Sequence, residues 1–251
     1  MKFKTFKTIF IASLIITSIL VSRSDVLAIP TLQLDISGGT YDWSTQTIIA
    51  PTDPFTLYAY LIPNRFNTLN DYYYISAAIV PQVTPPGSDL GSFVFNGQTI
   101  NVTSQMIYGV PPLEDIVEKQ GWDSGDLPKH GIFNTYFYEF EFQFNSSNQI
   151  HRYNTQDRAI SGESIPTSGN GMYYVAFNVD TSLLEPGYII HFDLYNTKIK
   201  CDGDIDVTQF APFSHDAQSN HDVPEPSTWL LLGSGLVGLG ILGRKRLKAN
   251  R

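Results

Sequence analysis

A strict two-residue alternation in the middle of the chain restricts the fold more than any other feature. Across residues 136–144 every even position is aromatic, whereas Glu139 and Glu141 occupy odd positions. Successive side chains of a β-strand point to opposite faces of a sheet, so this segment predicts a half-buried strand with one aromatic and one acidic face. Residues 173–179 repeat the pattern. The chain is therefore expected to fold mainly into sheets.

Similar patterns predict further strands, one hairpin and one helix. The other strand candidates are residues 55–62, 72–80 and 188–195. Asn96-Gly97 separates two short apolar runs and predicts a tight turn, because both residues accept the positive φ angles that such a turn needs. A helix is expected over residues 112–120, since Pro112 opens it and acidic residues occupy its first turn.

These elements predict an all-β fold, a single antiparallel β-sandwich that is jelly-roll-like. Short strands separated by Pro- and Gly-rich turns favour this class over folds that alternate strands and helices. The sandwich is assigned to residues 29–215 and a polar linker to residues 216–223. Cys201 is the single cysteine, which excludes a disulfide within the chain. A buried inert thiol and a bond to another chain both remain open.

Residues 1–28 have the pattern of a secretory signal peptide. Three lysines among the first seven residues precede an apolar run over residues 9–21. That run is shorter than the roughly 20 residues that a membrane span needs. The side chains at residues 26–28 predict cleavage by signal peptidase after Ala28. An uncleaved N-terminal anchor is the alternative.

Charge is divided unevenly along the chain. Residues 29–223 contain 7 basic and 22 acidic side chains, a net charge of −15, whereas the whole chain carries −8. Such a surface repels phosphate backbones and anionic lipid, so nucleic acid is excluded as a partner. A neutral glycan or a cation-rich exterior suits this charge, and solubility alone would also explain it.

Residues 224–251 combine a short motif, an apolar segment and a basic end. The motif is Pro224, Glu225 and Pro226. The apolar stretch over residues 227–243 predicts a transmembrane helix with Trp229 at the membrane interface, although its 17 residues are near the lower limit for a span. Positive charges next to a span are expected to stay in the cytoplasm. Here they are Arg244, Lys245 and Arg246.

This order of motif, Gly-rich span and Arg-containing tail resembles the PEP-CTERM sorting signal of Gram-negative bacteria. The resemblance implies that exosortase, an integral-membrane sorting protease, processes the chain near the motif, often alongside exopolysaccharide production. The expected route is export across the inner membrane, at least transient membrane anchoring through the C-terminal helix, and then the cell surface or the extracellular space. A permanent C-terminal anchor is the alternative.

The predicted sandwich carries a second resemblance. It rests on four segments. They are His-Phe-Asp-Leu-Tyr at residues 191–195, Phe-Ala-Pro-Phe-Ser-His-Asp-Ala at residues 210–217, and residues 91–97 and 109–112. These segments are similar to the choice-of-anchor N family, bacterial surface proteins whose homologous ectodomains end in different anchors. The similarity covers most of residues 30–222. It implies a surface location but no assigned activity, and therefore no catalytic residues.

Three alternating acidic residues form the candidate metal site. Asp202, Asp204 and Asp206 are spaced like the first ligands of an EF-hand loop, and Ca²⁺ prefers carboxylate oxygens. The later Gly and the distal acid of that loop have no counterpart in this sequence. A Ca²⁺ site completed by other residues and a solvated acidic turn are both open. No cofactor is required, and Ca²⁺ is the one candidate.

The histidines and the paired carboxylates do not form a known catalytic motif. His215 is expected in the exposed linker, as is His221. His191 and Asp193 share one face of a predicted strand because they are two residues apart. The Glu-x-Glu pair of the strand over residues 136–144 matches the separation of glycosidase acids, but it also suits the solvent side of a sheet.

These features predict an exported cell-surface or matrix protein with a structural or adhesive, non-enzymatic role. The alternatives are a Ca-assisted carbohydrate-binding module that acts on exopolysaccharide, and an extracellular glycoside-acting enzyme. An exposed groove lined by aromatic residues would favour the carbohydrate-binding module, and two facing carboxylates in a deep pocket would favour the enzyme. The aromatic candidates near predicted loops and strand ends are Tyr41, Trp43, Tyr72, Tyr73, Tyr74, Trp122 and Tyr153.

Overall fold

A computed structural model describes residues 29–84, 89–119, 131–196, 198–199, 205–206 and 210–220. The predicted signal peptide with its cleavage site at Ala28, the Pro224-Glu225-Pro226 motif and the predicted transmembrane helix with its basic end lie outside these residues. Among the helices that the structure describes, none has the length and apolar character to cross a bilayer.

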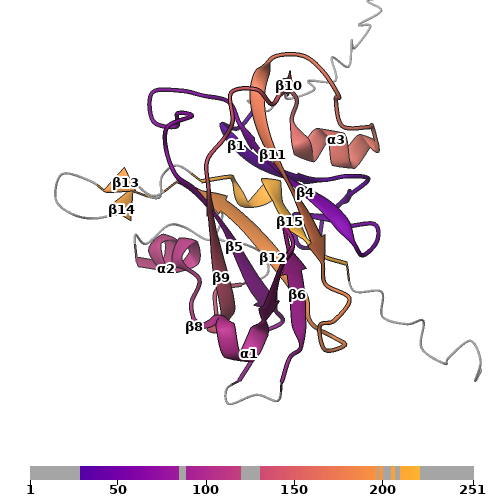
Figure 1. The fold of residues 1–251 in the computed structure, drawn as a ribbon, viewed down its shortest axis with the longest axis vertical. Helices are drawn as coiled ribbons and strands as arrows, with labels where there is room; N and C mark the ends of the chain where they lie inside the picture. The colour runs from indigo at the N-terminus through magenta and orange to yellow at the C-terminus, as the bar shows by residue number, and fades with distance from the viewer. Residues whose placement is uncertain are drawn as a thin grey trace, which may run out of the picture.

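Two β-sheets form the domain (Figure 1). Sheet A has the strand order β1-β4-β11-β6-β7, and β10 pairs with β11. Its strands are β1 (Leu32–Ile36), β4 (Phe55–Leu61), β6 (Ser92–Phe95), β7 (Gln98–Asn101), β10 (Gln149–His151) and β11 (Gly171–Asp180). Sheet B has the order β2-β3-β15-β12-β5-β9-β8. Its strands are β2 (Thr40–Asp42), β3 (Thr47–Ile49), β5 (Tyr73–Val80), β8 (Ile107–Gly109), β9 (Thr135–Phe142), β12 (Ile189–Tyr195) and β15 (Asp216–Gln218).

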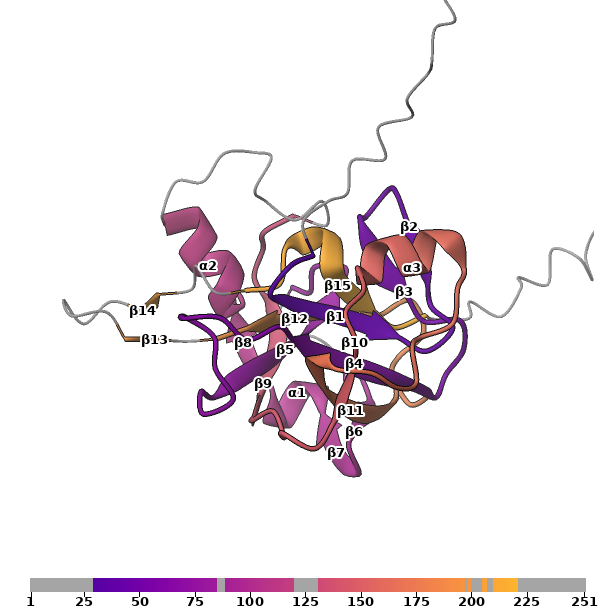
Figure 2. The ribbon, with the colours of Figure 1, turned by 90° about the horizontal axis from the view of Figure 1, so that it is seen from above.

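Short helices and one small hairpin complete the described part of the chain. They are α1 (Val102–Gln105), α2 (Pro112–Lys119), α3 (Thr155–Ser161), the 3₁₀ helix η1 (Phe213–His215), and the paired strands β13 (Lys198–Ile199) and β14 (Ile205–Asp206). In the two views of Figures 1 and 2, α2 and α3 lie on different sides of the molecule. Each helix therefore belongs to a different surface of the domain.

One hydrophobic core lies between the two sheets. The ring centroids of Phe55 in sheet A and Phe192 in sheet B are 6.2 Å apart, and those of Phe142 in sheet B and Phe177 in sheet A are 5.2 Å apart. Leu57 and the other apolar residues of the inward faces join the same buried cluster. The chain crosses between the sheets repeatedly, as in sandwiches with Greek-key connections. The prediction of a mainly β fold built from two sheets is confirmed.

The alternation predicts the strands that form this core. In β9, Phe140 packs against the core whereas Glu139 and Glu141 are exposed. The hairpin is also confirmed, since Asn96 and Gly97 connect β6 to β7 with φ angles of 48° and 84°. The predicted helix is α2. These elements follow from patterns that are local in the sequence.

The prediction of purely antiparallel pairing is wrong at one position. β15 runs parallel to β3, with Ala217 beside Ile48, so sheet B is mixed. A parallel pair needs a long connection between its strands, and here most of the domain lies between them. No local pattern in the sequence specifies such a pairing.

The polar linker predicted from residue 216 onward is also corrected. Asp216–Gln218 form the buried strand β15, because the backbone N–H of Ser219 donates to Ile190 O at 2.9 Å and Ala50 N–H donates to Gln218 O at 2.9 Å. His215 is buried rather than exposed, and its Nε2 is 3.1 Å from Oδ1 of Asn154. Burial lowers the pKa of His215 to about 4, so its ring is neutral at neutral pH. His221 lies outside the described residues.

Candidate functional site

A groove of about 820 Å³ lies on the outer face of sheet A. Its lining includes Tyr58 and Tyr60 of β4, Tyr174 of β11, residues 162–167 after α3, and the turn at residues 37–40 between β1 and β2. Sites for small ligands usually enclose about 300–1,000 Å³ and contain aromatic side chains. This tyrosine groove is therefore the candidate functional site.

The register of sheet A places the three tyrosines on one surface. Tyr60 pairs with Tyr174 across β4 and β11, and their neighbours Leu57 and Ala59 point into the core. The rings of Tyr58 and Tyr60 are stacked, with centroids 5.9 Å apart and planes 8° apart. Tyr58 and Tyr174 are half-buried, so part of each ring faces the groove.

Helix α3 stands beside this surface because the chain carries a start and a stop signal for it. The side chain of Asn154 accepts a hydrogen bond from the backbone N–H of Asp157 at 3.0 Å, which caps the N-terminus. Gly162 ends the helix with a φ of 71°, a left-handed conformation that glycine adopts without strain. The chain then turns into residues 162–167, which line the groove.

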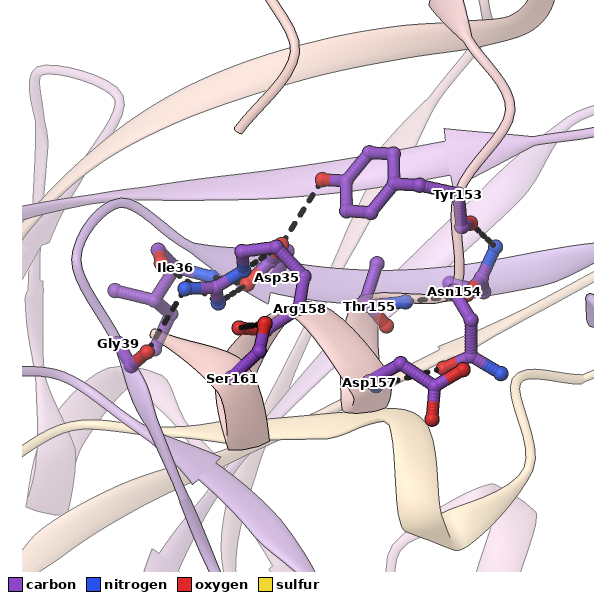
Figure 3. Close-up of polar contacts among 10 residues, drawn as sticks. Asp35, Ile36, Gly39, Tyr153, Asn154, Thr155, Asp157, Arg158 and Ser161 are labelled. Atoms are coloured by element: carbon purple, nitrogen blue, oxygen red, sulfur yellow. Dashed lines mark hydrogen bonds and ion pairs between the residues drawn. The ribbon is translucent and has the colours of Figure 1, made fainter. Parts of the chain in front are cut away.

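A buried ion pair attaches α3 to β1, as Figure 3 shows. The guanidinium of Arg158 donates to Asp35 from Nε at 3.0 Å and also from Nη2. Its Nη1 donates to the carbonyl oxygen of Gly39 at 2.9 Å, and the hydroxyl of Tyr153 donates to Asp35 at 2.9 Å. The side chains of Asp35 and Arg158 are 0% and 4% exposed. One guanidinium thus holds the helix, the strand and the following turn together.

The charges of Asp35 and Arg158 beside the groove are paired with each other inside the protein. Burial raises the pKa of Asp35 to about 6, although Arg158 and the hydroxyl of Tyr153 lower it, so the carboxyl is ionised at neutral pH. Because the guanidinium of Arg158 already binds Asp35 and the carbonyl oxygen of Gly39, it is not available to bind a ligand. Among the described residues that line the groove, Glu163 is the one carboxylate. The rest of the lining consists of tyrosine rings, hydroxyls, backbone, several aliphatic side chains and the paired guanidinium of Arg158.

Two of the residues in the predicted Ca²⁺ site, Asp202 and Asp204, lie outside the described residues. Asp206 ends β14, where its backbone lies opposite that of Lys198 in β13. The Ca²⁺ site stays a prediction, since the three acids are not described together.

The acidic pair on β9 is hydrogen-bonded within its own sheet. Each carboxylate accepts a hydrogen bond from a tyrosine of the same sheet, Glu141 from Tyr74 at 2.7 Å and Glu139 from Tyr195. These contacts lie on sheet B, away from the groove on sheet A. The two glutamates therefore have partners within the sheet surface.

The groove tyrosines were not among the aromatic residues predicted from the sequence to bind a ligand. Of those candidates, Tyr153 packs edge-on against Tyr60 with ring centroids 5.4 Å apart, whereas Trp43 and Tyr72 are exposed and do not line the groove. The signal was present in β4, where Tyr58 and Tyr60 occupy the positions that should be polar if that face met only water. Aromatic residues on both faces of a strand indicate a second packed or binding surface.

His191 and Asp193 share one strand face, as predicted, but this face is buried beneath α2. They lie there with Asp216 and Glu114, and all four side chains are at most 2% exposed. Burial and the charge of Asp193 raise the pKa values of Glu114 and Asp216. Burial lowers the pKa of His191, but Asp193 and Asp216 raise it to about 10.

Residues 222–246 match the family described as the PEP-CTERM protein-sorting motif. This motif indicates an exported protein that exosortase sorts at the membrane toward the cell surface, as the sequence of the tail predicted. The match covers the tail and not the sandwich. Neither a curated protein nor a solved structure matches the chain.

The buried ion pair yields a test of stability. Replacing Asp35 by Asn leaves the Arg158 charge buried without its counter-ion, which should lower the free energy of unfolding by about 3–5 kcal/mol. Lys119→Met is the matched control, because it breaks the exposed pair with Asp115 at 2.6 Å and should cost less than about 1 kcal/mol. Denaturant unfolding followed by circular dichroism measures both. Equal losses in the two variants would contradict the role given to the buried pair.

Proposed function

We propose that the chain is a non-enzymatic adhesive protein of the cell surface or extracellular matrix, and that its tyrosine groove binds a neutral segment of exopolysaccharide. The observation that carries this proposal is the pair of half-exposed rings of Tyr58 and Tyr174, backed by the buried ring of Tyr60, in a groove bordered by hydroxyl groups. Aromatic rings offer a flat apolar surface and tyrosine adds a polar group, a combination that suits the apolar faces and hydroxyls of a sugar.

The charge of the protein supports a neutral ligand. Residues 29–223 carry a net charge of −15, which repels anionic polymers. The one basic side chain that lines the groove, Arg158, is paired with Asp35. A neutral saccharide needs no counter-charge and can be recognised through stacking and hydroxyl hydrogen bonds alone.

An extracellular glycosidase is the less favoured function. Such enzymes use two carboxylates on either side of the glycosidic bond, about 5–9 Å apart. Among the described residues the groove has only Glu163. Assistance by Ca²⁺ bound at Asp202, Asp204 and Asp206 is a further part of the carbohydrate-binding proposal, although binding through the tyrosines does not require it.

Two further parts of the proposal concern the origin and maturation of the chain. The sandwich is proposed to belong to the choice-of-anchor N family, on the motifs that resemble it. The tail is proposed to be removed near Pro226 after signal peptidase has cut after Ala28. The mature protein would then consist of the sandwich and its linker, released from the inner membrane.

Replacing a groove tyrosine should weaken saccharide binding. For Tyr58→Ala and Tyr174→Ala we expect the Kd for fragments of the producing organism's exopolysaccharide to rise about 5-fold, because each variant removes a stacking surface that contributes about 1 kcal/mol. Isothermal titration calorimetry on protein recovered from cells measures the effect.

Tyr72→Ala is the control for this experiment. Tyr72 is 55% exposed but lies next to β5 in sheet B, outside the groove, so its loss should leave the Kd unchanged. Binding that is insensitive to both groove variants, or that depends equally on Tyr72, would rule out the tyrosine groove as the site.

Intact mass of the protein recovered from cells tests the proposed maturation. We expect a chain that begins at Ile29 and ends near Pro226, found in the outer-surface or medium fraction. Replacing Glu225 by Ala should leave the tail attached and the protein in the membrane fraction. A wild-type mass that retains residues 229–251 would mean that the chain is permanently anchored and that the tail is not removed.

A further inference from the structure

A cluster of charged side chains lies between α2 and the outer face of sheet B, well away from the tyrosine groove. His191 and Asp193 of β12 point outward, because Phe192 between them belongs to the core. β15 pairs with β12, which brings Asp216 beside them. Glu114 of α2 completes the group, which we call the α2 cluster. All four side chains are at most 2% exposed, so the cluster is closed to bulk water.

The distances in the α2 cluster are those of ligands around a metal ion. Nε2 of His191 lies 3.4 Å from Oδ1 of Asp193 and 3.6 Å from Oδ2 of Asp216. N–H···O hydrogen bonds are shorter, about 2.7–3.2 Å. Nitrogen and oxygen ligands about 2.1 Å from a tetrahedral ion lie about 3.4 Å from one another. One ligand atom from each of these three residues lies within 4.8 Å of the others.

A second observation, the lack of hydrogen-bond partners for buried carboxylate oxygens of Glu114 and Asp216, also points to a bound cation. Among the described residues, Oε2 of Glu114 has no hydrogen-bond partner, and neither carboxylate oxygen of Asp216 has one. No described Lys or Arg lies within ion-pair distance of either carboxylate. The charge of Glu114 interacts with Asp193, His191 and Asp216. A buried carboxylate with this little compensation costs several kcal/mol, and a cation bound among the four groups removes that cost.

We propose that the α2 cluster is a structural site for one divalent metal ion. The ligands are the imidazole nitrogen of His191 and the carboxylates of Asp193 and Asp216, with the charge of Glu114 nearby. This mixed set suits Zn²⁺ or Mn²⁺ better than Ca²⁺, which prefers oxygen ligands alone. Because the cluster is closed to bulk water, a substrate cannot reach the ion, as is expected of a structural rather than a catalytic metal.

The bound ion would connect β12 and β15 through its ligands and attract α2 through the charge of Glu114. Helix α2 supplies Glu114, β12 supplies His191 and Asp193, and β15 supplies Asp216. β15 has only three residues and is the last described strand before the sorting motif, so it gains the most from an added connection. The ion would therefore hold both α2 and the C-terminal strand against sheet B.

Metal content and thermal stability of the full chain recovered from cells test this site. We expect about one equivalent of Zn or Mn per chain by mass spectrometry of the elements. Removing the ion with a chelator should lower the Tm. Returning Zn²⁺ or Mn²⁺ to a free concentration of about 100 times its Kd should raise the Tm by about 5–10 °C.

Isosteric variants show whether the ion binds at the α2 cluster. Asp216→Asn removes a charged ligand and Glu114→Gln removes the carboxylate beside the ligands, and each should raise the Kd for the ion at least about 10-fold. Glu141→Gln removes an exposed carboxylate from the same sheet and should bind as the wild type does. In chelated protein, Glu114→Gln should unfold at the same Tm as the wild type or higher, because it removes a carboxyl whose ionised form is disfavoured by burial.

Two results would overturn the site. The first is a wild-type chain that holds no ion and whose Tm responds neither to the chelator nor to added Zn²⁺ or Mn²⁺. The second is a Glu114→Gln variant that binds the ion as tightly as the wild type, which would place the ion elsewhere, for example at Asp202, Asp204 and Asp206. Neither result bears on saccharide binding, so the metal site is tested independently of the proposed function.

Discussion

The ion pair between Asp35 and Arg158 is the constraint on which the candidate binding face depends. Removing two charges from water costs several kcal/mol per ion, and close, hydrogen-bonded geometry is needed to offset it. That geometry fixes where α3 stands on β1 and therefore where residues 162–167 run. Gln33, the other outward residue of β1, adds a second connection by accepting a hydrogen bond from Thr155 N–H at 2.9 Å. With α3 held over β1, the tyrosines of β4 and β11 line an open groove.

Each sheet has a short helix against its outer face, with at least one carboxylate buried between the helix and the sheet. The charge of these carboxylates is compensated differently in the two places. Under α3, Arg158 supplies the compensating charge to Asp35. Under α2, the carboxylates of Asp193 and Asp216 flank the imidazole of His191 with Glu114 nearby, and the proposed metal ion would compensate their charge. In both places a polar cluster fixes a helix that is too short to be stable by itself.

Sequence patterns predict the parts of this fold that are local. Alternation identifies β4, β5, β9, β11 and β12, and Asn96-Gly97 identifies the hairpin. Helix α3 was missed although Asn154 and Gly162 are ordinary cap residues, because its main support, Arg158, meets a partner 123 residues away. Asp216 was placed in a linker for the same reason, since only pairing with distant strands makes β15. Both polar clusters therefore depend on contacts that no window of sequence contains.

Hydrogen exchange of the recovered protein, with and without an excess of exopolysaccharide fragments, tests most directly whether the tyrosine groove is the binding site. Most of residues 162–167 are exposed, so their backbone amides should exchange quickly in the free protein. Saccharide bound against Tyr58 and Tyr174 should slow exchange in that segment and in the turn at residues 37–40, while α2 and β8 stay unchanged. Slowing confined to other segments, or no slowing at all, would contradict the assignment.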